Sequence, residues 1–297
     1  MVTPVVTVSK KGRAETMTDF WKLLVDPDIA FLRTALLMGL LASIAFGTTG
    51  SLVVVKRVSY VAGAVAHAVL GGIGAALYFQ RAHGIEWMHP LLGAFVAALL
   101  SAVLISWIRL SRFEREDSVI GAIWATGMAT GLVFISKTPG FVDPMSYLFG
   151  NILILSPLDL ILVGLMDLVL MVVMVFGYNR LQAVCFDEEQ ARLRGIHVGA
   201  YYTLLLCLIA CTVVLLVSVV GVVLVVALLT IPAAIASQYV KSLGAMMILA
   251  SGITAVFASV GIFLSYLWDW PVGPSIILLA GVAYMIQSLP RLILRKG

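Results

Sequence analysis

The chain has 297 residues, of which 62% are hydrophobic and 11% are charged, and its mean hydropathy is +1.09. The apolar residues occur in runs of about twenty, the length that crosses a bilayer core. A soluble domain of this length could not bury that much apolar surface, so the composition predicts a polytopic all-α membrane protein. The net charge of +4 therefore reports orientation in the membrane rather than nucleic-acid binding.

The sequence divides into two unequal parts. Residues 1–30 form a polar tail and an amphipathic stretch that we expect to lie on the membrane surface. Residues 31–297 form a single transmembrane domain, a helical bundle of about eight or nine spans. The apolar run from 199 to 238 can hold two spans, or one span and a re-entrant half-helix. The candidate spans are 31–54, 58–79, 90–108, 119–136, 158–178, 199–217, 218–238, 244–267 and 274–290.

Lysines and arginines are distributed unevenly among the loops. If the turn at Lys56 and Arg57 is cytoplasmic, the same side receives nearly all the other basic loop residues, and the opposite loops receive only Arg81 and Lys137. This bias predicts an external N-terminus and a cytoplasmic C-terminus, because basic loops stay inside. The basic residues of the N-terminal tail argue the other way.

The most polar stretch in the body of the chain is CFDEEQARLRGI, residues 185–196. Its acids precede its bases, an order that suits the dipole of a short helix, and a glycine near its end is a typical stop signal. The loop charges place this helix in the cytoplasm. The residues concerned are Asp187, Glu188, Glu189, Arg192 and Gly195.

A histidine interrupts one of the apolar runs. His67 lies in RVSYVAGAVAHAVLGG, with Gly63 four residues before it and Gly71 four residues after it. These positions share one helix face, and small residues on a face allow close approach of another helix. The stripe is therefore either a packing contact or the lining of a translocation pathway in which His67 meets the cargo. A proton relay is a third interpretation, since ionisable groups in hydrocarbon usually have a function.

Asp167 is the second ionisable residue within an apolar run, SPLDLILVGLMDLVLMVVMVFGYNR. A carboxylate there needs a cation, a hydrogen-bond donor or water. It is either protonated or hydrogen-bonded to a neighbouring helix, or it belongs to the pathway. Covalent chemistry has little support, because the sequence holds no G-x-x-x-x-G-K-[ST], H-E-x-x-H or G-x-S-x-G pattern. Transport without catalysis by this chain is the expected function.

Four segments together resemble the membrane subunits of zinc and manganese ABC importers. KRVSYVAGAVAHAVLGG is similar to the family pattern R-R-x-S-x-x-G-D-A-x-x-H-A-x-L-x-G. The other three are YLFGNIL, VSVVGVVLVVALLTIPAAIAS and WDWPVGPSIIL, and all four occur in the family's order over about residues 35–290.

The resemblance implies the permease subunit of an ATP-driven importer with a type II ABC importer-like fold, in the bacterial plasma (inner) membrane. It implies zinc or manganese as the transported ion and no bound cofactor. The implied partners are a second permease copy or a paralogue, two ATPase subunits, an extracytoplasmic metal-binding protein and membrane lipid. Residues 185–196 become the coupling helix that docks on the ATPase. The alternatives are an importer for iron or a metal chelate, a proton-coupled secondary transporter, or a membrane scaffold.

The sequence departs from the family pattern at Gly63, where the family carries an aspartate. An aspartate with an imidazole suits zinc or manganese by ligand type, and the resemblance implies that the pair serves the metal pathway. Here His67 lacks that partner. The pathway is then poor in ligands, or the carboxylate comes from elsewhere, with Asp167 as the candidate. Alternatively a paralogue supplies it, or the cargo is a chelated metal.

Overall fold

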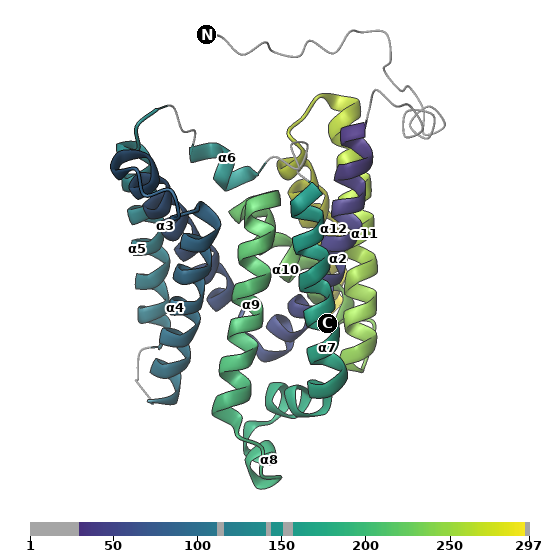
Figure 1. The fold of residues 1–297 in the computed structure, drawn as a ribbon. Coiled ribbons are helices and arrows are strands. Elements are labelled where there is room, and N and C mark those ends of the chain that lie inside the picture. Colours follow the sequence, from purple (N-terminus) through teal and green to yellow (C-terminus); the bar gives the residue numbers. More distant parts are fainter. Residues whose placement is uncertain (1–29, 112–115, 141–143, 151–156, 295–297) are drawn as a thin grey trace.

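The structure is a computed structural model that describes residues 30–111, 116–140, 144–150 and 157–294. Throughout these ranges the regular elements are helices, and the first of them carries the label α2 (Figure 1). The predicted tail and amphipathic stretch, residues 1–30, lie almost entirely outside the described residues. The helices are α2 (Ala30–Lys56), α3 (Ser59–His83), α4 (Pro90–Leu110), α5 (Glu116–Lys137), α6 (Pro144–Phe149), α7 (Pro157–Phe186), α8 (Glu188–Leu193), α9 (Val198–Val220), α10 (Val222–Ala236), α11 (Leu243–Trp268) and α12 (Val272–Leu294).

Eight of these helices are long and apolar enough to cross a membrane: α2, α3, α4, α5, α7, α9, α11 and α12. The ninth candidate is α10, which has only 15 residues. At 1.5 Å per residue it is roughly 22 Å long, less than the bilayer core of about 30 Å. The continuous apolar run therefore holds one full span and one shorter helix, which is the eight-span alternative.

The break between α9 and α10 lies at Gly221, which packs against Gly150. Gly221 has a φ of 83° and Gly150, just after α6, has a φ of 66°, a region that L side chains rarely adopt. A Cβ atom on Gly221 would lie 2.3 Å from the backbone nitrogen of Gly150. The backbone after α6 therefore packs directly on the α9–α10 turn.

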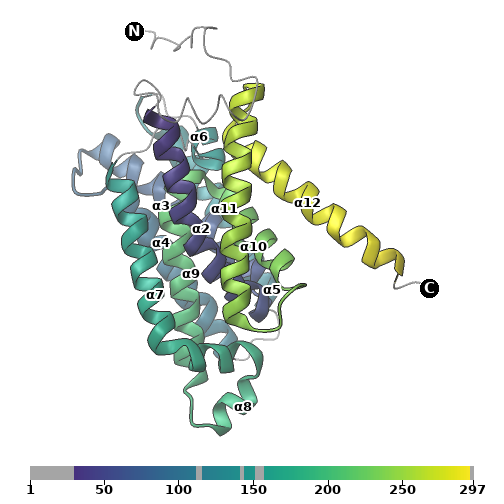
Figure 2. The same ribbon diagram turned by 90° about the vertical axis from the view of Figure 1, so that its right-hand side faces the viewer.

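The helices form two groups on either side of α9. In one group α3 packs on α5 and α4, and α4 packs on α9. In the other, α2 packs on α11, α10 and α7, and α7 also packs on α9 (Figure 1). The last helix, α12, contacts α11 and α10 and then diverges from the bundle (Figure 2).

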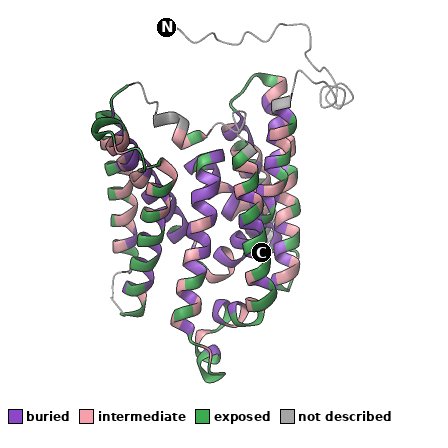
Figure 3. Cartoon of the chain, viewed as in Figure 1, coloured by how far each residue is buried: buried purple, intermediate pink, exposed green. Residues whose placement is uncertain are grey.

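Burial follows this arrangement. The central helix α9 is buried over most of its length, whereas the outer face of α7 is exposed (Figure 3). That face carries large apolar side chains, among them Leu165, Leu168, Val175 and Phe176. An apolar surface of this extent fits the hydrocarbon of a bilayer rather than water. The polar helix α8 lies at the end of the bundle opposite α6 (Figure 1).

Candidate functional site

The helix α8 starts at a side-chain cap. The Asp187 Oδ1 atom accepts hydrogen bonds from the backbone N–H groups of Glu189 and Gln190, each at 3.0 Å. Such a cap satisfies donors that the first turn of a helix leaves free. The helix is followed by Gly195 at a φ of 75°, which suits the glycine stop. The polar segment thus folds as a short helix held at both ends by local signals in its sequence.

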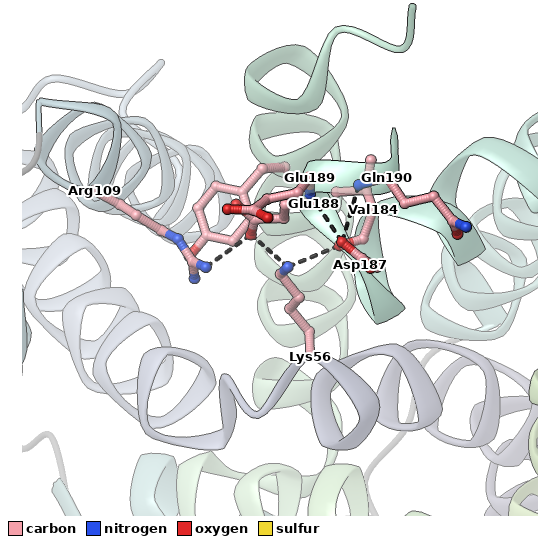
Figure 4. A network of polar contacts seen from close by, with 8 residues as sticks. Lys56, Arg109, Val184, Asp187, Glu188, Glu189 and Gln190 are labelled. Carbon is pink, nitrogen blue, oxygen red and sulfur yellow. Dashed lines mark hydrogen bonds and ion pairs between the residues drawn. The ribbon is translucent and has the colours of Figure 1, made fainter. Parts of the chain in front are cut away.

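Glu188 ties α8 to the ends of two membrane helices (Figure 4). Its Oε1 atom accepts a hydrogen bond from Lys56 Nζ at 2.5 Å and another from Arg109 Nη2 at 2.8 Å. Lys56 Nζ also donates to the backbone oxygen of Val184, at 2.8 Å. The Lys56 side chain is only 8% exposed, so its charge depends on these partners.

Arg109 extends the contact to α9. Its Nη1 atom donates to the hydroxyl of Tyr202 at 3.1 Å, and its guanidinium carbon lies 4.3 Å from the centre of that ring. Tyr202 is 1% exposed, which gives the arginine a fixed support. We call Lys56, Arg109, Glu188 and Tyr202 the α8 anchor. It joins α2, α4 and α9 to α8 at one end of the bundle.

The charges of the α8 anchor set the ionisation of Glu188. Partial burial by itself raises the pKa of this carboxyl, but the hydrogen bond and charge of Lys56, with the charges of Arg109 and Arg192, hold the pKa below its ordinary value. Glu188 is therefore ionised at neutral pH.

The opposite face of the segment is exposed rather than packed on the described part of the bundle. Leu193 is 89% exposed and Phe186 is 61% exposed, and Glu189, Arg192 and Arg194 are exposed beside them. Glu188 belongs to the same polar segment and was predicted to contact the ATPase with them, but in the structure its side chain points inward, to Lys56 and Arg109. The outward face therefore offers apolar and charged side chains to a partner, while Glu188 holds the helix on the body.

His67 lies against an aromatic ring that the sequence did not single out. Its imidazole stacks on the indole of Trp124 in α5, with ring centres 4.5 Å apart and planes at 30°. Trp124 also stacks on Tyr60, at 5.5 Å. The Nδ1 atom of His67 is buried and has no hydrogen-bond partner within the described ranges.

The glycine stripe of α3 lies at its contact with α5. A Cβ atom on Gly63 would be 2.4 Å from a ring carbon of Trp124, and one on Gly71 would be 2.9 Å from the backbone oxygen of Gly127. These distances are shorter than any real Cβ contact, so α5 can approach only because both positions are glycine.

Asp167 belongs to α7, which lies on the other side of α9 from α3, the helix of His67 (Figure 1). The helix α7 packs on α2 and α9, whereas α3 packs on α5 and α4. The Asp167 side chain is buried, and neither carboxyl oxygen has a hydrogen-bond partner among the described residues. In that part of the chain no group of three or more His, Cys, Asp or Glu side chains is arranged to hold a metal ion.

Four residues of these sites were not singled out by the sequence: Lys56, Arg109, Tyr202 and Trp124. Lys56 and Arg109 entered the sequence analysis only as indicators of topology, and Tyr202 and Trp124 did not enter it at all. A lysine or arginine at the cytoplasmic end of a span is ordinary, and so is a tryptophan within one. No local signal in the sequence identifies their partners.

The arrangement is that of an ABC transporter permease. The chain resembles the solved structure titled "PsaBC from Streptococcus pneumoniae in complex with Fab", with a TM-score of 0.80 and 28% identity, over 91% of this chain and 95% of that one. The model of the family described as "ABC 3 transport family" matches residues 28–291. The chain therefore belongs to the ABC 3 transport family, as a multi-pass membrane protein, and the resemblance drawn from the four motifs is confirmed.

Curated relatives are similar over most of their length. The "Probable metal transport system membrane protein" of Chlamydia trachomatis serovar D is 41% identical, over 84% of this chain and 85% of that protein. The "Manganese import system permease protein ScaB" of Streptococcus gordonii is 31% identical, over 88% of this chain and 91% of that protein.

Proposed function

We propose that this chain is the permease subunit of an ATP-driven importer for a divalent transition metal, zinc or manganese, in the bacterial inner membrane. The metal is cargo, and ATP hydrolysis belongs to separate subunits. The observation that carries the proposal is α8, a polar helix anchored to the bundle on one face and exposed on the other, in a chain of the ABC 3 transport family. The metal transport and manganese import named for the relatives support a metal as cargo.

The helix α8 acts as the coupling helix. Phe186 and Leu193 enter a groove of an ATPase subunit, and Glu189, Arg192 and Arg194 contact its rim. A movement of α8 then reaches the ends of α2 and α4 through the α8 anchor, because its charged contacts resist separation from the buried Lys56. The α2 end leads within three residues into α3, the helix that carries His67.

A second permease copy or a paralogue completes the membrane part. The outer face of α5 supports this partner, because over residues 122–130 it exposes small side chains, whereas α7 exposes many large ones. Small residues allow two membrane helices to pack closely. The exposed small residues of α5 are Ala122, Ala125, Thr126, Ala129 and Thr130. An extracytoplasmic metal-binding protein delivers the cargo at the α6 end.

Within the membrane, His67 is the proposed contact for the ion. Neutral imidazole ligates divalent metals, and its buried Nδ1 atom lacks a protein partner in the described residues. Gly63 and Gly71 share the face of His67, and their proposed part in the passage is to let α5 pack beside it, because Trp124 and the backbone of Gly127 fill the space over them. Asp167 stays a candidate carboxylate, on a helix at the other side of α9. Sparse ligands suit a passage, since an ion must leave each site that it enters.

The test is the complete transporter reconstituted into liposomes with its ATPase and its binding protein. Zinc or manganese delivered by the binding protein should stimulate ATP hydrolysis and enter the liposomes only when ATP is present. Uptake driven by a pH gradient without ATP would instead support a proton-coupled transporter. Uptake of iron or a chelate alone would support the related importers, and absence of any uptake would support a scaffold.

A further inference from the structure

The indole of Trp124 occupies the space above Gly63. A Cβ atom at position 63 would lie 2.4 Å from Cζ3, 2.8 Å from Cη2 and 3.3 Å from Cε3 of that ring. Any side chain at position 63 would therefore have to displace the indole. Position 63 and Trp124 form a matched pair in which glycine on α3 admits a large ring from α5.

The same indole determines what surrounds His67. Position 63 lies one helical turn before position 67 on the same face, so it is one of the places on α3 from which a second side chain could reach an ion at His67. The structure fills that place with the indole, which stacks on the imidazole at 4.5 Å. The indole therefore occupies the space beside His67 that a carboxylate at position 63 would need.

We propose that Trp124, together with Gly63, determines the metal preference at His67 by excluding an oxygen ligand from position 63. Imidazole nitrogen suits zinc, whereas carboxylate oxygen suits manganese. A passage with imidazole and indole but no adjacent carboxylate favours zinc over manganese. This inference rests on the proposed function, specifically on contact between His67 and the transported ion.

The experiment compares two double variants in the reconstituted transporter. Gly63→Asp/Trp124→Ala adds a carboxylate in the space vacated by the ring, and Gly63→Ala/Trp124→Ala adds only a methyl group there. Uptake of zinc and manganese is measured from mixtures of the two ions. The manganese-to-zinc uptake ratio should be about tenfold higher for Gly63→Asp/Trp124→Ala than for Gly63→Ala/Trp124→Ala. Changes in the groups around a metal ligand typically alter metal affinity by about this factor or more.

Further variants separate the steric effect from the chemical one. Gly63→Asp and Gly63→Ala alone should both lower the melting temperature, because each Cβ atom strikes the indole. Trp107→Ala, which removes an exposed tryptophan of α4, should leave the uptake ratio unchanged. If the alanine at position 124 prevents assembly, Trp124→Leu keeps apolar volume there and permits the same comparison.

Three outcomes would overturn the inference. The role of Trp124 would be refuted if the two double variants showed equal uptake ratios while His67→Ala lost transport. The proposed function would then still stand. Normal transport of both metals by His67→Ala would refute the contact between His67 and the ion, and the inference with it. No ATP-dependent metal uptake by the unmodified transporter would refute the proposed function itself.

Discussion

Replacing Glu188 by glutamine removes the charge at the centre of the α8 anchor and keeps the size of the side chain. Glu188 accepts charge-assisted hydrogen bonds from Lys56 and Arg109. Each such bond contributes about 1.5–3 kcal/mol when it is well shielded. Glu188 and Arg109 are 28% and 30% exposed, so solvent weakens their contact, whereas Lys56 is 8% exposed. We expect Glu188→Gln to weaken the free energy that holds α8 against the ends of α2 and α4 by roughly 2–3 kcal/mol.

The loss should appear as uncoupling rather than as unfolding. The spans of the bundle do not depend on Glu188, so the variant should insert and bind its ATPase, while hydrolysis moves less metal per ATP. The assay measures ATP hydrolysis and metal uptake on the same liposomes. Glu189→Gln is the matched control, because that side chain is exposed on the same helix. Equal coupling ratios for the two variants would refute the mechanical role of the α8 anchor.

Four further predictions follow from the same geometry. Folding lowers the pKa of Glu188, so its ionised form stabilises the folded protein fully above its ordinary pKa of 4.5. This stabilisation is lost as the pH falls through the lower pKa of the folded state. Melting curves of the complex should therefore show a Glu188-dependent loss of stability only below about pH 4.5. His67→Ala should lower uptake while the protein still inserts and binds its ATPase; a lower melting temperature with unchanged transport per molecule would show that His67 only packs. Asp167→Leu should raise the melting temperature, because it removes a buried unpaired polar group. Asp167→Asn should reduce metal uptake if the carboxylate serves the cargo. Normal uptake by Asp167→Asn would exclude that role. An impermeant thiol reagent applied to intact cells should label a cysteine at Asp269 and not one at Glu189, and the reverse pattern would contradict the predicted orientation.

The class of the protein, its membrane helices and its short polar helix α8 could be predicted from the sequence. A bilayer demands apolar runs of a certain length, and the charge order and glycine around α8 are local signals, so no knowledge of neighbouring elements is needed. The count of spans was harder. The structure places the break of the long apolar run at Gly221, between the end of α9 and the start of α10, whereas one glycine within such a run is a weak sign by itself.

The partners of the candidate site residues were decided by tertiary structure. The direction in which Glu188 points depends on where the ends of α2 and α4 lie around α8, and the order of charges in the segment does not distinguish Glu188 from Glu189. The stacking of Trp124 over Gly63 and His67 depends on the rotation and offset of α5 against α3, which hydropathy does not record. His67 and Asp167 look equivalent as ionisable residues in apolar runs. The packing of their helices on opposite sides of α9 separates them, because contacts between distant segments arise only when the bundle assembles.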